Sequence, residues 1–344
     1  MEKPKLSNYL FTGTTVPHIV ELYAKDLAVS ESQIDIFHSS FLVNYMSLIT
    51  NNEFLDRYVT IFRAMYLAII SKFPNVTIVF KGRIKSLRRV EEKINRYIIK
   101  YVNEYYILHD IFPNEDDVVK YLYRFRDLMA FRIIVSLPSC HLKKFNNVED
   151  LEMFKQEREI DYLRQIVNFV YKFLTTNGLD AVIASQLVDV TSISTTKNIN
   201  NKIAKYLKDY IQSPKPNGYR AIHICFSDRF FKSETGIPMF IEFQFQTKSM
   251  NDFTSFDSDH VSYEMNQKES IKIKSYSFAK EDLPEYILNA QERLNDLYCL
   301  NLEQLNIDLF SCRYINGVPK FNDYSGFYVP RSILSYEHIS KEQH

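Results

Sequence analysis

A turn between residues 213 and 223 carries side chains that could bind a nucleotide. Residues 214–218 (Pro-Lys-Pro-Asn-Gly) should form a rigid turn, because proline fixes φ and Asn-Gly tolerates positive φ. An aromatic ring, a guanidinium and an imidazole follow at Tyr219, Arg220 and His223. A ring beside cations on a stiff turn can hold a base and its phosphates together. A surface hairpin with a structural tyrosine explains this stretch equally well.

The stretch 239–246 alternates between two sets of side chains. With a period of two, one face of a strand carries one set and the opposite face carries the other. The first set is Met239, Ile241, Phe243 and Phe245, and the second is Phe240, Glu242, Gln244 and Gln246. A carboxylate in mid-strand at Glu242 is costly to bury unless it is paired, exposed in a cleft or bound to a metal. A sheet face that meets solvent, common in antiparallel sheets, is the simpler alternative.

A second carboxylate, Asp127, comes just before an apolar, β-branched stretch at 131–135 that predicts a buried strand. If both strands belong to one sheet, Asp127 and Glu242 could converge on a Mg²⁺ ion bound to phosphates. An ion pair between Asp127 and Arg124 or Arg126 is the alternative, and spacing alone favours it.

Basic side chains surround the end of the first predicted strand. Arg83 and Lys85 alternate, so they point the same way while the chain is extended. Ser86 can cap the helix that follows, and a helix N-terminus beside cations is an anion site. Lys93 lies about two turns further along this helix. These residues predict a phosphate site, and a solvated basic helix face is the common alternative.

Hydrophobic periodicity predicts the elements that must position these groups. Residues 1–75 are mostly helical by pattern, and one helix face would carry Ile34, Phe37, Phe41, Tyr45 and Leu48. Strands are predicted at 76–80, 131–135, 181–190, 219–226 and 239–245, and further helices at 86–101, 163–177 and 281–300. Loops are predicted at 139–160 and 192–201, and irregular structure at 305–344. Helices between strands indicate an α/β (α+β) fold with a mixed β-sheet flanked by helices.

Composition limits the classes of protein that remain. The 344 residues are 46% hydrophobic, which allows a sizeable core in one large or two modest domains. The 42 basic and 42 acidic residues balance, so bulk attraction to nucleic acid or to a membrane is not indicated. Four scattered cysteines without a CxxC pair indicate reduced thiols and a cytoplasmic location. We find no signal-peptide core, membrane-spanning stretch or glycine-rich phosphate loop, so side chains must hold any phosphate.

Taken in order, four stretches resemble the motifs of the synthetase domain of the RelA/SpoT family. They are 83–86 (Arg-Ile-Lys-Ser) with Lys93 downstream, 127–132 (Asp-Leu-Met-Ala-Phe-Arg), 208–223, and the strand 242–247 (Glu-Phe-Gln-Phe-Gln-Thr). Residues 255–263, with His260, resemble a helix of the short, single-domain members. The resemblance covers residues 45–270, and it implies a synthetase domain at 46–270 with helical extensions at 1–45 and 271–344.

The resemblance implies a nucleotidyltransferase-like fold and an enzyme that moves the β,γ-pyrophosphate of ATP to a 3′-hydroxyl, releasing AMP. It implies that Asp127 and Glu242 hold Mg²⁺, and that Glu242 shares this metal or acts as the base. The residues implied for ATP are Arg83 and Arg132 around the adenine, with Lys85, Ser86 and Lys93 on the phosphates. The residues implied for the acceptor are Tyr219, stacked on the base, with Lys215, Asn217, His223 and Gln244 around it.

Two positions depart from the family pattern. Arg89 stands where the family usually has a small hydroxyl residue, and Gln246 stands where it usually has arginine. These differences change where positive charge lies in the site. They bear on the choice of acceptor more than on the binding of ATP. The pair His109-Asp110 is similar to the signature of the family's hydrolase domain, but it lies between the first and second motifs. We interpret this pair as incidental.

The leading hypothesis is a GTP/GDP diphosphokinase-type transferase that makes (p)ppGpp, with ATP and a guanosine nucleotide as partners and no membrane partner. An alternative keeps the chemistry but modifies the 3′ end of tRNA, as toxin-type relatives do. The lysines that could form a local tRNA footprint are Lys143, Lys144, Lys197, Lys202 and Lys205. A second alternative is a nucleotide-binding regulator without catalysis, which has less need for both Asp127 and Glu242. The extensions would suit a homo-oligomer contact or an antitoxin-type regulator.

Overall fold

The computed structural model of the chain describes residues 4–9, 16–50, 52–123, 125, 128–138, 148–184, 201–229, 239–256, 283–299, 307–315 and 318–322. Its helices are η1 (Leu6–Asn8), α1 (Val16–Ala28), α2 (Gln33–Thr50), α3 (Asn52–Lys72), α4 (Leu87–His109), α5 (Glu115–Leu122), α6 (Val148–Thr176), α7 (Asn201–Ala204), α9 (Lys248–Phe256) and α11 (Glu285–Cys299). Its strands are β1 (Thr77–Ile84), β2 (Met129–Ser136), β3 (Leu179–Ala181), β4 (Leu207–Asp209), β5 (Ile222–Asp228), β6 (Phe240–Thr247), β7 (Ile307–Ile315) and β8 (Val318–Asn322).

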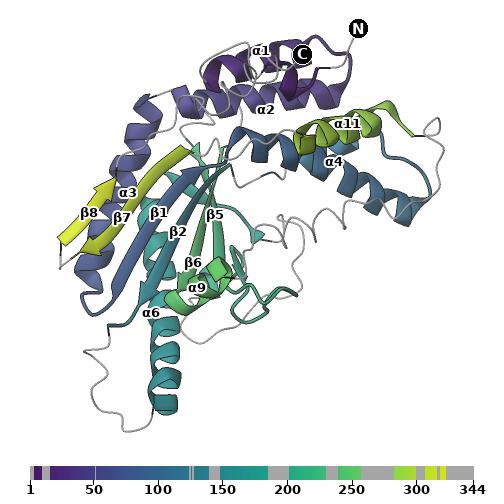
Figure 1. Ribbon diagram of the computed structural model, residues 1–344. Coiled ribbons are helices and arrows are strands. Elements are labelled where there is room, and N and C mark those ends of the chain that lie inside the picture. The colour runs from purple at the N-terminus through teal and green to yellow at the C-terminus, as the bar shows by residue number, and fades with distance from the viewer. Residues whose placement is uncertain are drawn as a thin grey trace, which may run out of the picture.

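One mixed sheet contains these strands (Figure 1). Their order is β3-β5-β6-β2-β1-β7-β8, and β4 pairs with β5 beside this path. The central pair, β2 and β6, is parallel, whereas every other described pairing is antiparallel. Helices pack against the sheet, so the prediction of a mixed β-sheet flanked by helices is confirmed.

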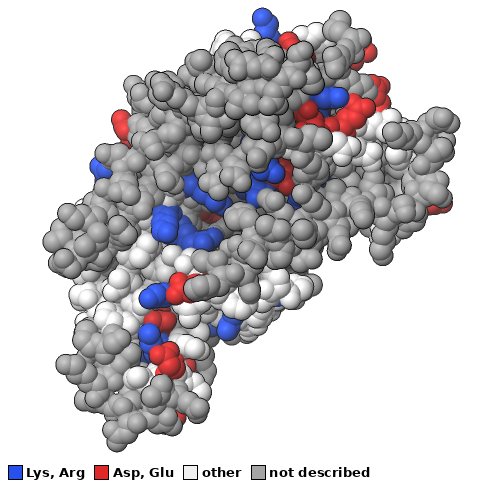
Figure 2. Space-filling view, viewed as in Figure 1, with Lys and Arg blue, Asp and Glu red and all other residues white. Residues whose placement is uncertain are grey.

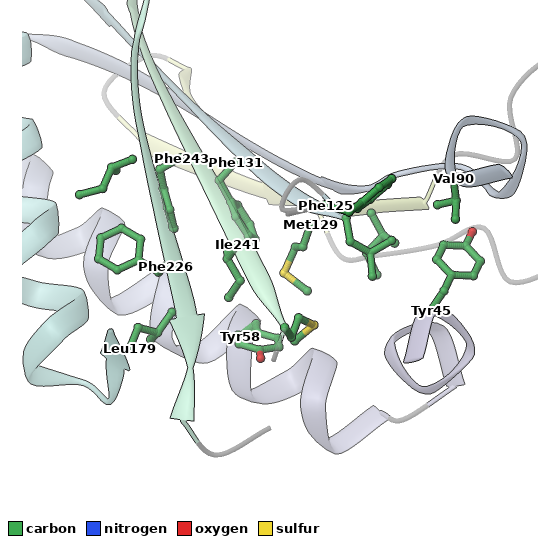
Figure 3. Close-up of a cluster of buried hydrophobic side chains, with 14 of the residues drawn as sticks. Tyr45, Tyr58, Val90, Phe125, Met129, Phe131, Leu179, Phe226, Ile241 and Phe243 are labelled. Carbon is green, nitrogen blue, oxygen red and sulfur yellow. The ribbon is translucent and has the colours of Figure 1, made fainter. Parts of the chain in front are cut away.

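One face of the sheet is a layer of aromatic rings (Figure 3). The ring centroids of Phe80 and Phe131 are 5.4 Å apart, and those of Phe131 and Phe243 are 5.2 Å apart. Phe62 of α3 packs on this layer, with its ring centroid 4.2 Å from that of Phe131. Full burial of one such ring stabilises the fold by about 1.5–3 kcal/mol. Gly82 lies under the layer, and a Cβ there would come within 2.1 Å of the Phe131 ring, so β1 needs glycine at this point.

Helices α3 and α6 cover this apolar face, and α6 lies behind β2 and β6 in the view of Figure 1. The predicted apolar stripe of α6 is fully buried at Leu163, Ile166, Val167, Val170 and Leu174. The helix ends before Gly178, which has φ +93°. Glycine suits this left-handed conformation, so the predicted helix and its stop signal are confirmed.

The opposite face of the sheet is polar. Lys81 and Arg83 of β1 are exposed, and Arg132, Glu242 and Gln244 of β2 and β6 are half-buried. Helix α9 packs on β2 and β6 from this side, because its Asn251 binds the Arg132 side chain. The period-two alternation therefore separates a core face from a face available for chemistry.

Helices α1, α2, α4 and α11 pack together beside the sheet (Figure 1) and enclose a buried carboxylate. Glu91 of α4 accepts a hydrogen bond from the Tyr23 hydroxyl (2.8 Å), and its other oxygen is 2.7 Å from His38 Nε2. Arg293 of α11 pairs with Asp35 of α2 at 2.6 Å. Burial raises the pKa of Glu91, but His38 and Arg293 outweigh burial and hold this pKa below its ordinary value. Residues of both predicted extensions thus contact α4, while the domain boundaries stay a prediction.

Two stretches between residues 139 and 190 differ from the sequence-based expectations. The prediction of a loop at 139–160 is wrong from residue 148, where α6 begins. Its first turns are charged, but Leu151, Phe154 and Ile160 pack against the core, which makes this segment one amphipathic helix. The strand predicted at 181–190 ends at Ala181, and residues 185–200 lie outside the described part of the chain.

The prediction of irregular structure at 305–344 is wrong for β7 and β8. Strand β7 pairs antiparallel with β1, and β8 pairs with β7. The partner edge of β1 lies far away in the sequence, so no local pattern indicates this pairing.

Among the described helices, none combines the length and the apolar character needed to cross a bilayer.

We expect the buried Glu91 to make stability depend on acid pH. Its pKa is lowered in the folded state, so its contribution is present above the unfolded-state pKa, about 4.3, and is lost as pH falls through the folded-state pKa. The Glu91→Gln variant should lose roughly 3–5 kcal/mol near neutral pH, because it removes one member of a buried network of charged and hydrogen-bonded groups. It should also flatten the fall in stability below about pH 4.3. Urea unfolding at a series of pH values measures both effects.

Glu104→Gln is the matched control on the same helix, since the Glu104 side chain is 49% exposed. It should leave the acid dependence of the wild-type chain intact. Identical acid slopes for wild type and the Glu91 variant would contradict the role assigned to this carboxylate.

Candidate active site

The polar face carries its functional groups in rows that cross neighbouring strands. One row, each member paired in register with the next, is Lys81 (β1), Arg132 (β2), Gln244 (β6), His223 (β5) and Lys208 (β4). The adjacent row is Arg83, Ala130, Glu242 and Cys225. In the view of Figure 1, Figure 2 shows Lys and Arg side chains gathered over β1 and β2. Cations and a carboxylate therefore share one face.

Glu242 lies at the centre of these rows and is held by two neighbours. Its Oε1 is 3.0 Å from His223 Nδ1, and its Oε2 accepts a hydrogen bond of 2.7 Å from Gln244 Nε2. Its side chain is 22% exposed. Of the possibilities left open by the sequence, the structure thus shows a paired carboxylate that still reaches solvent.

The partners of His223 fix where its protons lie. A carboxylate only accepts, so Nδ1 carries hydrogen toward Glu242. The other ring nitrogen, Nε2, is 2.8 Å from the Tyr219 hydroxyl and accepts from it in the neutral ring. A hydrogen-bonded path therefore runs from Tyr219 through His223 to Glu242.

The turn before β5 has the predicted geometry. Gly218 has φ +76°, and its N–H donates to the carbonyl of Lys215 at 2.8 Å. The Asn217 side chain accepts a hydrogen bond from the Tyr219 N–H at 3.2 Å. This closure presents Lys215 and Asn217 to solvent and keeps Tyr219 half-buried.

Aromatic rings form a wall beside this turn. The rings of Tyr210 and Tyr219 each meet the His223 ring edge to face, with centroids 5.2 Å and 5.7 Å away. Lys215 Nζ lies 4.6 Å from the centroid of Tyr210 and 5.0 Å from that of Tyr219. The predicted ring beside a cation is confirmed, and Tyr210 is a further member that the sequence analysis missed.

Two polar side chains anchor the turn to the sheet. Asp209 Oδ1 accepts hydrogen bonds from the N–H groups of Ile211 and Gln212, at 2.9 Å and 3.1 Å. Gln246, fully buried on β6, donates to the carbonyl of Arg220 at 3.0 Å. The residue that departs from the family pattern at Gln246 thus fixes the exit of the turn.

Arg132 turns its guanidinium toward β6 and α9. Its Nε and Nη2 donate to Gln244 Oε1 at 3.3 Å and 3.1 Å, and its Nη1 donates to Asn251 Oδ1 at 3.2 Å. These acceptors lie along the edge of the guanidinium, so they fix its plane. A planar guanidinium held by its edge can still stack through its face.

The predicted phosphate segment lies at the junction of β1 and α4. Arg83 is exposed on β1, and the Lys85 N–H donates to the carbonyl of Leu128 at 2.8 Å. Ser86 is the N-cap of α4 and accepts from the Arg89 N–H at 3.4 Å. The predicted cap is confirmed. Since Arg83 and Glu242 face across Ala130, about 10 Å separates their strands.

Two further cations near α4 have partners of their own. Lys93 Nζ lies 4.8 Å from the ring centroid of Phe125 and 5.2 Å from that of Tyr97. Arg89, the other departure from the family pattern, pairs with Glu92 at 3.0 Å. The charge of Arg89 is thus offset locally by a carboxylate.

Several predicted residues lie outside the described part of the chain. They are Asp127 with its alternative partners Arg124 and Arg126, the lysines Lys143, Lys144 and Lys197, and His260. The convergence of Asp127 and Glu242 therefore stays a prediction. Lys202 and Lys205 are exposed on and after α7. His109 and Asp110 are exposed at the end of α4, where His109 packs on the Tyr105 ring.

No described group of three or more His, Cys, Asp or Glu side chains could hold a metal ion by itself. Glu242 supplies carboxylate oxygens, the ligands that Mg²⁺ prefers. Glu242 thus fits one protein ligand in a site completed by phosphate oxygens.

Comparison with known proteins gives one family match. Residues 182–268 match the model described as "Region found in RelA / SpoT proteins". These residues include the turn, β5, β6 and α9, and so Tyr219, His223, Glu242 and Gln244. The comparison with curated proteins gives no match.

Among the solved structures similar to the chain are two alarmone synthetases by title and a GTP pyrophosphokinase family protein. Small alarmone synthetase 2 from Bacillus subtilis is 16% identical, with a TM-score of 0.30, and the match covers 71% of this chain and 89% of that one. Small alarmone synthetase 1 from the same organism, bound to its product pppGpp, is 14% identical, with a TM-score of 0.33 and coverage of 75% and 92%. A GTP pyrophosphokinase family protein from Streptococcus pneumoniae is 14% identical, with a TM-score of 0.32 and coverage of 77% and 90%. At such values these likenesses carry no inference about substrate or reaction.

The anchor at Gln246 gives a test of how the turn is held. In Gln246→Leu the Arg220 carbonyl loses its donor, so hydrogen exchange at the Gly218 and Tyr219 amides should become faster. The unfolding free energy should change by less than about 1.5 kcal/mol, the net value of one hydrogen bond. Gln165→Leu, an exposed change on α6, is the matched control. Equal exchange rates in both variants would show that the turn does not depend on Gln246.

Proposed function

We propose that this chain, whose residues 182–268 match the region found in RelA/SpoT proteins, is a pyrophosphokinase. It transfers the β,γ-pyrophosphate of ATP to the 3′-hydroxyl of GDP or GTP. The 3′-oxygen forms a bond to the β-phosphorus, the bond from that phosphorus to the α,β-bridging oxygen breaks, and AMP leaves. The observation that carries this proposal is Glu242, held between His223 and Gln244 on a face that also bears cations.

The acceptor would bind at the aromatic wall. Its base would stack on Tyr219, whose ring is oriented by the hydrogen bond to His223. Lys215 and Asn217 are exposed on the same turn and would contact the base edge or the 5′-phosphates. Stacking on one ring is worth about 1–3 kcal/mol and tolerates any base. Guanine must therefore be chosen by the polar groups around the ring.

ATP would bind on the side of β1 and β2. Arg83 and Arg132 would sandwich the adenine. The hydrogen bonds of Arg132 lie along the edge of its guanidinium, so its face can stack on the base. Lys85, Ser86 and Lys93 would hold the phosphates near the N-terminus of α4, where backbone N–H groups favour an anion.

The reaction needs negative charge at Glu242 in either of its proposed roles. As a base it would take the proton of the attacking 3′-hydroxyl, and as a ligand it would share Mg²⁺ with Asp127. When bound, Mg²⁺ would neutralise charge on the phosphate oxygens. His223 and Gln244 donate to both oxygens of Glu242 and so fix the position of the carboxylate.

A transfer assay tests the function and its alternatives. Purified chain is incubated with γ-³²P-ATP and Mg²⁺, and GDP, GTP, ADP or deacylated tRNA is offered in turn. We expect label in GDP and GTP. Label in tRNA alone would support the tRNA-modifying alternative, and no label with retained binding of an ATP analogue would support a non-catalytic regulator.

Glu242→Gln should reduce transfer by at least about a hundredfold, the usual contribution of a positioned base, and leave ATP binding within a few-fold. Glutamine keeps the size of the side chain, removes its charge and replaces one acceptor oxygen with an N–H donor. Glu157→Gln on the exposed side of α6 is the control and should transfer normally. A parallel loss of ATP binding would mean that Glu242 serves folding or ground-state binding instead.

Two substitutions at Tyr219 separate stacking from the hydrogen bond. Tyr219→Ala should raise the KM of the acceptor by roughly tenfold to a hundredfold, while the KM of ATP stays within a few-fold. Tyr219→Phe keeps the ring and should raise the acceptor KM much less. A defect confined to ATP would overturn the stacking role. Steady-state kinetics with each substrate varied in turn gives these constants.

A further inference from the structure

The side-chain amide of Gln244 joins the two halves of the candidate site. Its Oε1 accepts from Arg132 Nε and Nη2, at 3.3 Å and 3.1 Å. Its Nε2 donates to Glu242 Oε2 at 2.7 Å. Gln244 lies between Arg132 and His223 in one row of the sheet, so the strand register holds it in this place.

Only one orientation of the Gln244 amide satisfies these hydrogen bonds. A guanidinium only donates, and an ionised carboxylate only accepts. The amide must therefore turn its oxygen to Arg132 and its nitrogen to Glu242, and a flipped amide would lose all three hydrogen bonds. The orientation of Gln244 is thus determined by charges on both sides.

The same contacts extend in both directions. The connected path, in order, is Asn251, Arg132, Gln244, Glu242, His223 and Tyr219. It begins on α9, crosses β2, β6 and β5, and ends on the turn before β5. Arg132, the proposed adenine-stacking residue, is next to one end of the path, and Tyr219, the proposed acceptor-stacking residue, is the other end.

We propose that Gln244 is a positioning residue that couples the binding of ATP to the binding of the acceptor. This inference rests on the proposed function. Stacking of adenine on Arg132 further restrains the guanidinium that Gln244 and Asn251 already hold, and this restraint passes through the Gln244 amide to the carboxylate of Glu242. Glu242 in turn holds His223 and the ring of Tyr219. Each nucleotide therefore further restrains groups that the other needs, and the coupling must be equal in both directions.

Three substitutions dissect this role. Gln244→Met keeps an unbranched side chain of similar length and removes both contacts. Gln244→Glu keeps an acceptor for Arg132 but places a carboxylate against Glu242, so it breaks one side alone. Gln165→Met, on the exposed side of α6, is the matched control.

The experiment is titration calorimetry of the full chain with α,β-methylene-ATP, which cannot be cleaved at the transferred bond, in the presence of Mg²⁺. Each titration is run with and without saturating GDP. In wild type and in Gln165→Met we expect GDP to tighten analogue binding by about 5- to 150-fold, the usual range of such coupling. In Gln244→Met the ratio of the analogue affinities with and without GDP should fall to within about twofold, and the analogue alone should bind within a few-fold of wild type.

In Gln244→Glu the presence of GDP should also no longer tighten binding of the analogue. The analogue alone should still bind, because the introduced carboxylate keeps an acceptor for Arg132. If the Met variant does not fold, this variant provides the test. A ratio that survives in either variant would overturn the inference, and so would a selective loss of GDP binding, which marks a direct acceptor contact. If wild type binds neither nucleotide, the proposed function itself fails. If wild type transfers label but shows a ratio near one, only the inference fails.

Discussion

The parallel pairing of β2 with β6 sets which residues of the two strands share a face, and the candidate site depends on it. In this register Ala130 lies beside Glu242, and Arg132 lies beside Gln244. A slip of one residue would turn Glu242 into the phenylalanine layer and bring Phe243 to the polar side. Because an ionised carboxylate is strongly unfavourable among apolar rings, the core enforces the register that the site needs.

Glu242 accepts a hydrogen bond on each of its two carboxylate oxygens. One donor is an imidazole N–H and the other is the Gln244 amide, which in turn accepts from the guanidinium of Arg132. Hydrogen bonds to a carboxylate favour its charged form. The arrangement thus fixes the carboxylate where, under the proposed function, it would meet a proton or a metal ion that arrives with substrate.

Local geometry made part of this structure predictable from the sequence. The alternation at 239–246 placed Glu242 and Gln244 on one face, and Asn-Gly placed positive φ at Gly218, because both depend on neighbouring residues alone. The contact of Asn251 with Arg132 was not predicted, since it requires α9 to fold back over the sheet. The first turns of α6 were predicted as a loop because they carry many charges. Strand β7 was not predicted because it pairs with β1, which is distant in the sequence. The role of Asp127 stays a prediction.

The pairing of β1 with β7 has a consequence for how the chain is made. Strand β1 is synthesised before β7, the strand that covers its outer edge, because residues 85–306 lie between them in the chain. Until then, that edge presents unpaired backbone groups to other nascent chains, a common route to aggregation. Lys81 and Arg83 project from this strand, and charges on an edge strand oppose such association. The cations proposed to meet a nucleotide in the mature protein would therefore also protect the unfinished one.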